Sequence, residues 1–139
     1  MSYDGYAYGL RDTDITIAGL AVQVTTGVSV GVQQASGMGL VVTVPGTVGG
    51  GDGNAEFQVQ TSPRLPQVLV DAGVTVTTTW RGTSTKKSRI PLSGAIETHN
   101  WRLNGPILDN VRLQVSPDSA AAAGTIQVFW LSDRPLSSL

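Results

Sequence analysis

Apolar and polar residues alternate with a period of two along most of this chain. In the runs 111–115 and 126–130, apolar side chains occupy every second position. A period of two places those side chains on one face of a β-strand, and so on the buried side of a sheet. The connection between the two runs is rich in turn-forming residues, which predicts an antiparallel hairpin with Trp130 in the core.

Shorter apolar or alternating runs precede that predicted hairpin, each bounded by Gly, Ser or Pro: 15–17, 20–24, 28–32, 40–44, 55–59, 67–71 and 74–80. Units of this length, recurring at intervals of about 8 to 12 residues, are typical of β-sandwiches and jelly rolls. Gly, Val and Thr are abundant, which suits tight turns and half-buried strands. We therefore predict a single-domain, all-β antiparallel sandwich over residues 15–132, jelly-roll-like and with about eight strands.

Residues 1–14 are predicted to form an extended N-terminal arm. Tyrosine residues interleaved with glycine interrupt the alternation here, at Tyr3, Tyr6 and Tyr8. Tyrosine offers a large contact area at a small cost in side-chain entropy, so the arm is a candidate to pack against a neighbouring subunit. A partly disordered terminus is the alternative.

Residues 133–139 are predicted to form a C-terminal tail. Pro135 ends the last strand, because proline cannot donate to a β-ladder. Leu136 and Leu139 are expected to dock either on the domain or on a neighbour.

Composition and charge exclude several classes of protein. The chain has 139 residues, no Cys, and a formal net charge of -1 from 9 basic and 10 acidic residues. The lack of Cys excludes disulfides and thiolate metal sites, and the balanced charge argues against a nucleic-acid binder. No apolar run reaches the roughly 18 residues of a membrane span, and the chain does not begin like a signal peptide. We therefore expect no nucleic-acid and no membrane partner, and assembly in the cytoplasm.

The residues that could take part in catalysis do not form a recognisable catalytic motif. His99 is the sole histidine, no GxSxG motif accompanies it, and a single histidine without Cys cannot build a typical zinc site. His99 is interpreted as a polar surface or loop residue between two strands. Most acidic residues fall at turns, where Asp bonds the backbone that follows, so a catalytic carboxylate pair has no support. We expect a protein that is not an enzyme and that has no cofactor and no metal.

Two further motifs admit a ligand-binding interpretation. The glycine-rich segment 47–54 lacks the lysine of a P-loop and leads into a strand, so it is interpreted as a loop tip. Asp12 and Asp14 could hold a cation, but a solvated loop or a turn cap is the favoured interpretation.

The only charge cluster of the chain lies in residues 81–89. It contains four of the nine basic residues: Arg81, Lys86, Lys87 and Arg89. The segment is interpreted as a solvated hairpin loop. A partner of this loop would be an acidic protein surface rather than DNA.

The tryptophans favour an alternative function. Trp130 belongs to the core register, whereas Trp80 and Trp101 are expected at strand ends, where their rings could face a sugar. A carbohydrate- or receptor-binding sandwich on a virion or cell surface is therefore the second hypothesis.

The segment 100–112, NWRLNGPILDNVR, resembles the penultimate region of many small phage structural proteins. The small size, the lack of Cys, the Gly/Val/Thr-rich β pattern, the Tyr/Gly arm and the apolar tail are similar to those of capsid decoration (cement) proteins of tailed bacteriophages. The resemblance implies a non-enzymatic virion structural protein that stabilises the capsid lattice. Its implied partner is the major capsid protein or another virion protein, and its implied location is the virion, assembled in the host cytoplasm.

The predicted strands also suggest self-association. Lys and Arg are scarce in 20–32 and 40–44. Strand edges without charge are less prone to aggregation when another chain covers them. This predicts a homo-oligomer, a trimer or a dimer. The candidate interface residues are Tyr3, Tyr6, Tyr8, Arg81, Lys86, Lys87, Arg89, Trp101, Leu136 and Leu139.

Overall fold

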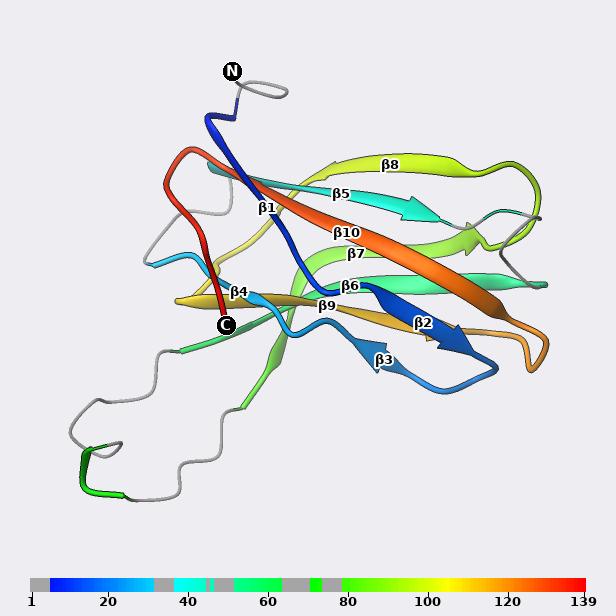
Figure 1. The fold of residues 1–139 in the computed structure, drawn as a ribbon, viewed down its shortest axis with the longest axis horizontal. Helices are drawn as coiled ribbons and strands as arrows, with labels where there is room; N and C mark the ends of the chain where they lie inside the picture. The colour runs from blue at the N-terminus through cyan, green and yellow to red at the C-terminus, as the bar shows by residue number, and fades with distance from the viewer. Residues whose placement is uncertain (1–5, 32–36, 45, 47–51, 64–70, 74–78) are drawn as a thin grey trace.

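Two antiparallel sheets pack together around one apolar core (Figure 1). The computed structural model describes residues 6–31, 37–44, 46, 52–63, 71–73 and 79–139. Within them no helix is long and apolar enough to cross a membrane. The all-β sandwich predicted from the period-two pattern is confirmed.

The first sheet has the strand order β1-β10-β5-β8. Strand β2 pairs with the first residues of β10, whereas β1 pairs with its last residues. Its strands are β1 (Tyr8–Arg11), β2 (Ile15–Ala18), β5 (Met38–Val44), β8 (Glu97–Arg102) and β10 (Ala123–Ser132). In Figure 1 the dark-blue β1 runs across the long orange β10. Strand β10 is therefore central to this sheet, with β8 at its far edge.

The second sheet has the strand order β11-β4-β9-β6-β7, and β3 also pairs with β9. Its strands are β3 (Gln23–Val24), β4 (Val28–Ser29), β6 (Asn54–Ser62), β7 (Arg81–Pro91), β9 (Asn110–Pro117) and β11 (Ser137–Ser138). Strand β3 covers only part of the predicted run 20–24, and β4 only part of 28–32. The run 67–71 and most of 74–80 lie outside the described residues.

The core lies between the sheets and follows the alternation. Strand β9 buries its odd positions, Leu113 among them, while β10 buries its even positions, Trp130 among them. Phe57 of β6 and Leu40 of β5 belong to the same cluster. The prediction that Trp130 is a core residue is confirmed.

The predicted hairpin of 111–115 and 126–130 is wrong, because β9 and β10 lie in different sheets. Their connection is tied to β6 instead. The carboxylate of Asp118 accepts a hydrogen bond from the backbone N–H of Asn54 at 2.8 Å, and the Asp118 N–H donates to the Asn54 carbonyl at 2.9 Å. The connection therefore crosses from one sheet to the other. Alternation identifies which face of a strand is buried, but it does not identify the pairing partner.

The interpretation of 81–89 as a hairpin loop is also wrong. These residues form β7, the edge strand of the second sheet, paired with β6 across two register shifts. Charge along an edge strand prevents another chain from adding to the sheet, which is a physical reason for basic residues here. Lys86 lies 3.5 Å from Glu56 of β6, and both side chains are largely exposed.

The N-terminal segment is part of the sandwich over its described residues, which corrects the predicted arm. Strand β1 pairs with β10, and Tyr6 is buried. The physical reason is that Leu10 lies opposite Trp130 and packs against the core, while Gly9 leaves room for the side chain of Phe129. Residues 1–5, including Tyr3, lie outside the described residues.

The C-terminal tail docks on the domain. Strand β11 pairs with β4, and the backbone N–H of Leu139 donates to the carbonyl of Gly27 at 3.3 Å. Leu136 packs against the core, whereas Leu139 remains half-exposed. Of the two alternatives left open for the tail, docking on its own domain is the one observed.

A matched pair of leucines tests this description of the core. Leu113 is 0% exposed and Leu108 is 43% exposed. We expect Leu113→Ala to lower the free energy of unfolding by about 2–5 kcal/mol, because it removes buried methyl groups and leaves a cavity. Leu108→Ala should change that energy by no more than about 0.5 kcal/mol. Urea denaturation of both variants checks the difference, and equal effects would contradict the arrangement of the sheets.

Candidate functional site

A hollow of about 610 Å³ lies on the outer face of the first sheet, on the side away from the core. Strands β1, β10 and β5 and the segment before β1 build it. It is lined by Tyr6, Ala7, Tyr8, Gly9, Arg11, Val41, Thr43, Gln127, Val128, Phe129 and Leu131. Most of the lining is apolar or aromatic, with polar groups at the sides.

Two glycines explain why the sheet is hollowed here. Gly9 of β1 and Gly39 of β5 flank Leu131 of β10 in one cross-strand row. A Cβ at position 9 would overlap the Phe129 ring, and one at position 39 would lie 3.0 Å from the Tyr6 ring. Both rings therefore lie over glycines, where the sheet has no side chains of its own.

Tyr6 is held firmly at one side of the hollow. Its hydroxyl donates to the carbonyl of Met38 at 3.0 Å, and its side chain is buried. The guanidinium of Arg102, from β8, lies 5.8 Å from the centroid of the Tyr6 ring, within cation–π range. Because its hydroxyl and ring both have partners, this wall exists before any ligand arrives.

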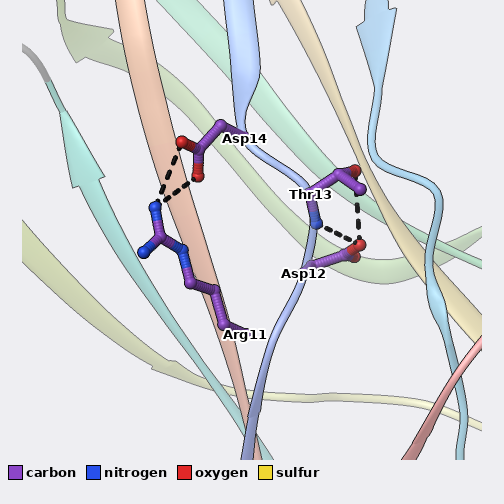
Figure 2. A network of polar contacts seen from close by, with 4 residues as sticks. All are labelled: Arg11, Asp12, Thr13 and Asp14. Atoms are coloured by element: carbon purple, nitrogen blue, oxygen red, sulfur yellow. Dashed lines mark hydrogen bonds and ion pairs between the residues drawn. The ribbon is translucent and has the colours of Figure 1, made fainter.

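The charged group of the lining is neutralised locally. Arg11 directs its guanidinium to both carboxylate oxygens of Asp14, at 2.9 and 3.1 Å (Figure 2). On the opposite wall, the hydroxyl of Thr43 lies 3.2 Å from that of Thr98. The hollow therefore presents polar atoms without a net charge.

Asp12 organises the turn that leads out of β1. Figure 2 shows its carboxylate directed away from the Arg11–Asp14 pair, toward Thr13. Its Oδ1 accepts from the backbone N–H of Thr13 at 2.7 Å and of Gly27 at 3.0 Å. Its Oδ2 accepts from the indole N–H of Trp130 at 2.9 Å. Asp12 is thus a buried turn cap, while Asp14 forms an exposed ion pair.

These partners answer the question of a cation site at Asp12 and Asp14. Both carboxylates are occupied by donors from the chain itself. Across the residues that the structure describes, no group of three or more His, Cys, Asp or Glu side chains is placed to hold a metal ion.

The structure separates the predicted interface residues into several places. Arg81, Lys86, Lys87 and Arg89 are all exposed along β7. Tyr6 and Tyr8 line the hollow, and the two leucines of the tail lie beside β4. Trp101 lies in β8. The predicted set therefore does not form one continuous site, and its role in subunit contacts stays a prediction.

His99 lies within β8, which corrects its interpretation as a loop residue. Its ring stacks on Trp101 with centroids 5.9 Å apart, and its side chain is 22% exposed. Its Nε2 is buried and lies 3.5 Å from Oε2 of Glu97, without a hydrogen-bond partner among the described residues. The ring therefore stacks at the edge of the core, where Trp101 packs.

The two tryptophans considered for sugar binding both have ring partners in the structure. The guanidinium of Arg112 covers the face of Trp80, 4.4 Å from its centroid, and its Nε donates to Gln60 at 2.7 Å. Burial lowers the pKa of Arg112 from its ordinary value. Trp101 is half-buried and meets Phe57 edge-on, with centroids 5.6 Å apart. One ring face of Trp80 is thus covered by a guanidinium, and the Trp101 ring is stacked on that of His99.

The exposed aromatic rings belong to residues that the sequence interpretation did not combine. Tyr8 is 47% exposed and Phe129 is 40% exposed, and both line the hollow. The signal for Phe129 was present in the alternation, because the neighbour of a core residue on a strand points to the opposite face. The pairing of β1 with β10, which places Gly9 beside the Phe129 ring, had no such signal.

Comparisons with known proteins leave the fold and the site to be argued from this chain. No protein-family model and no curated protein matches it. It is similar to the crystal structure of PirA, with a TM-score of 0.47 and 16% identity over 86% of this chain and 92% of that one. It is also similar to a structure of infectious bursal disease virus, Gt strain, with a TM-score of 0.32 and 11% identity, over 96% of this chain and 33% of that one. At such low TM-scores neither likeness carries an argument.

Asp12 and Asp14 form a matched pair for testing the turn. Asp12→Asn places an amide N–H₂ against donors that now meet carboxylate oxygens, at a buried position. We expect it to lower the free energy of unfolding by about 1–3 kcal/mol. Asp14→Asn removes an exposed ion pair and should cost no more than about 1 kcal/mol. Thermal unfolding of both variants checks this, and a larger loss in Asp14→Asn would refute the assigned roles.

Proposed function

We propose that this chain is a non-enzymatic structural protein of a virion, a capsid decoration protein that stabilises the lattice through contacts with other subunits. The observation that carries the proposal is a row of exposed apolar side chains at alternate positions. Leu20, Val22 and Val24 are 58%, 55% and 41% exposed. We call these three residues the apolar row. Apolar side chains that gather on a surface, rather than scatter singly, are typical of protein–protein contacts.

The apolar row lies where the chain passes between the sheets. Strand β2 before it pairs with β10 of the first sheet, while β3 at its end pairs with β9 of the second. The row therefore occupies one side of the sandwich, apart from the hollow. A subunit that covers it would also cover the short strand β3.

The size of the apolar row suits repeated contacts. Complete burial of a Val or Leu side chain contributes about 1.5–3 kcal/mol, so half-exposed residues would each contribute roughly half of that. Such a contact is weak for a single pair of chains. A symmetric oligomer or a lattice repeats this contact many times, and the summed free energy then becomes sufficient to hold the subunits together.

A second feature supports a partner of acidic character. Strand β7 exposes Arg81, Lys86, Lys87 and Arg89 along one edge of the sandwich. Clustered charge steers association with a surface of opposite sign. We assign this edge to contacts with the major capsid protein or another virion protein, in keeping with the resemblance of segment 100–112 to phage structural proteins.

Co-expression tests the assembly role. The chain would be expressed together with the coding sequences that flank it, and the lysate separated on a sucrose gradient. The proposal predicts that the chain sediments with particles in a constant ratio to their main protein. A chain that stays at the top of a gradient containing assembled particles would overturn the proposal.

A matched pair of substitutions tests the apolar row. Val22→Lys places a charge in the row, whereas Ile96→Lys places one at an equally exposed apolar residue outside it. We expect Val22→Lys to reduce particle-bound protein about tenfold or more, equivalent to about 1.4 kcal/mol per contact. Ile96→Lys should leave binding unchanged. Size-exclusion chromatography with light scattering should show an oligomer for the unmodified chain and a smaller species for Val22→Lys; a monomer for both would count against self-association.

A further inference from the structure

The hollow on the outer face of the first sheet has the dimensions of a small-molecule site. Its volume of about 610 Å³ falls within the range of about 300–1,000 Å³ that ligand pockets occupy. A second hollow of about 350 Å³ adjoins it and shares Tyr6 and Leu131 with it. A ligand longer than the first hollow could therefore extend past Tyr6, toward Asn100 and Arg102 of β8.

The aromatic lining requires a ligand with an apolar face. Phe129 is 40% exposed, so its ring is partly in water unless something covers it. Val41 and Leu131 lie on the same face of the sheet and complete an apolar floor. A flat molecule bearing C–H groups on one face would cover the Phe129 ring without losing hydrogen bonds.

The polar lining requires hydrogen-bonding groups at the edge of that ligand. Gln127 offers an amide with both donors and an acceptor, and the hydroxyl of Thr43, already bonded to that of Thr98, can still accept one more hydrogen bond. A purely apolar ligand, such as an acyl chain, would leave the Gln127 amide without partners, which costs free energy. The ligand therefore carries hydroxyls or similar groups around its rim.

Charge in the lining indicates that the ligand is neutral. The guanidinium of Arg11 already meets the carboxylate of Asp14, so an anion would have to compete for it. No carboxylate belongs to the lining itself, so a cation would find no counter-ion among these residues. An apolar face, a hydroxylated rim and no net charge together describe a saccharide.

We propose that the hollow is a binding site for a neutral saccharide. The sugar ring lies over Phe129, and its hydroxyls bond with Gln127 and Thr43. The site is preformed, because Tyr6 is fixed to the carbonyl of Met38 and Gly9 leaves space for Phe129. It lies apart from the apolar row and goes beyond the proposed assembly role, since a decoration protein with such a site would also bind glycans at a cell surface.

Nuclear magnetic resonance titration tests the site directly. Maltose, cellobiose and lactose would be titrated into ¹⁵N-labelled full-length chain, together with an array of neutral oligosaccharides. The proposal predicts saturable shifts for the amides of Gly9, Thr43, Gln127 and Phe129 with at least one sugar. It is overturned if none of these sugars shifts these amides, or if shifts appear only elsewhere on the surface.

Matched variants separate binding from folding. Phe129→Ala and Gln127→Ala should each weaken the apparent affinity about tenfold or more, whereas Leu108→Ala should leave it unchanged. Leu108 is 43% exposed, close to the 40% of Phe129, but it lies outside the hollow. Gly9→Ala displaces the Phe129 ring and should weaken binding while keeping every side chain of the lining. Equal affinity in Phe129→Ala and Leu108→Ala would overturn the site.

The two proposals fail independently. Val22→Lys should lose particle binding yet keep the sugar-induced shifts, because the apolar row is separate from the hollow. Phe129→Ala should behave in the opposite way. Sialyllactose serves as a charged probe, and preferential binding of it over lactose would overturn the assignment of a neutral ligand.

Discussion

The hydrogen bond between Trp130 and Asp12 is the interaction on which much of this structure depends. Trp130 is completely buried, and its indole N–H would lose a water partner on folding without replacement. The carboxylate of Asp12 replaces that partner and also accepts from the backbone N–H groups of Thr13 and Gly27. One side chain thereby connects β10, the turn after β1 and the segment before β4. These three hydrogen bonds replace those that the Asp12 carboxylate would make with water, so its burial is compensated.

This connection has consequences on both faces of the first sheet. On the inner face it orients the largest side chain of the core, Trp130. On the outer face it holds β1 alongside β10, and β1 contributes Tyr8, Gly9 and Arg11 to the hollow. The segment predicted to reach out to a neighbour therefore forms a wall of a site on its own domain. Core and candidate site thus share one element, and a change that released β1 would affect both.

The alternation of residues predicted the fold class and much of the core, because a period of two reports directly which side chains are buried. Leu113 and Trp130 were recognisable in this way. Strand pairing was not recognisable, because the connection between β9 and β10 crosses from one sheet to the other. The carboxylate of Asp118 in this connection accepts a hydrogen bond from the backbone N–H of Asn54. The candidate site could be predicted from the sequence even less well. Asp12 was recognised as a possible turn cap, but its partner Trp130 lies 118 residues away, and no local pattern reports such a contact.

The core and the hollow both depend on the pairing of the N-terminal segment with β10, and amide hydrogen exchange measures that pairing. The backbone N–H of Asp12 donates to Val128 at 2.9 Å, and those of Thr13 and Gly27 donate to Asp12. We expect these three amides to exchange as slowly as those of the paired β6 and β9. Exchange at the rate of an unstructured peptide in these three amides, while β6 and β9 stay protected, would contradict it.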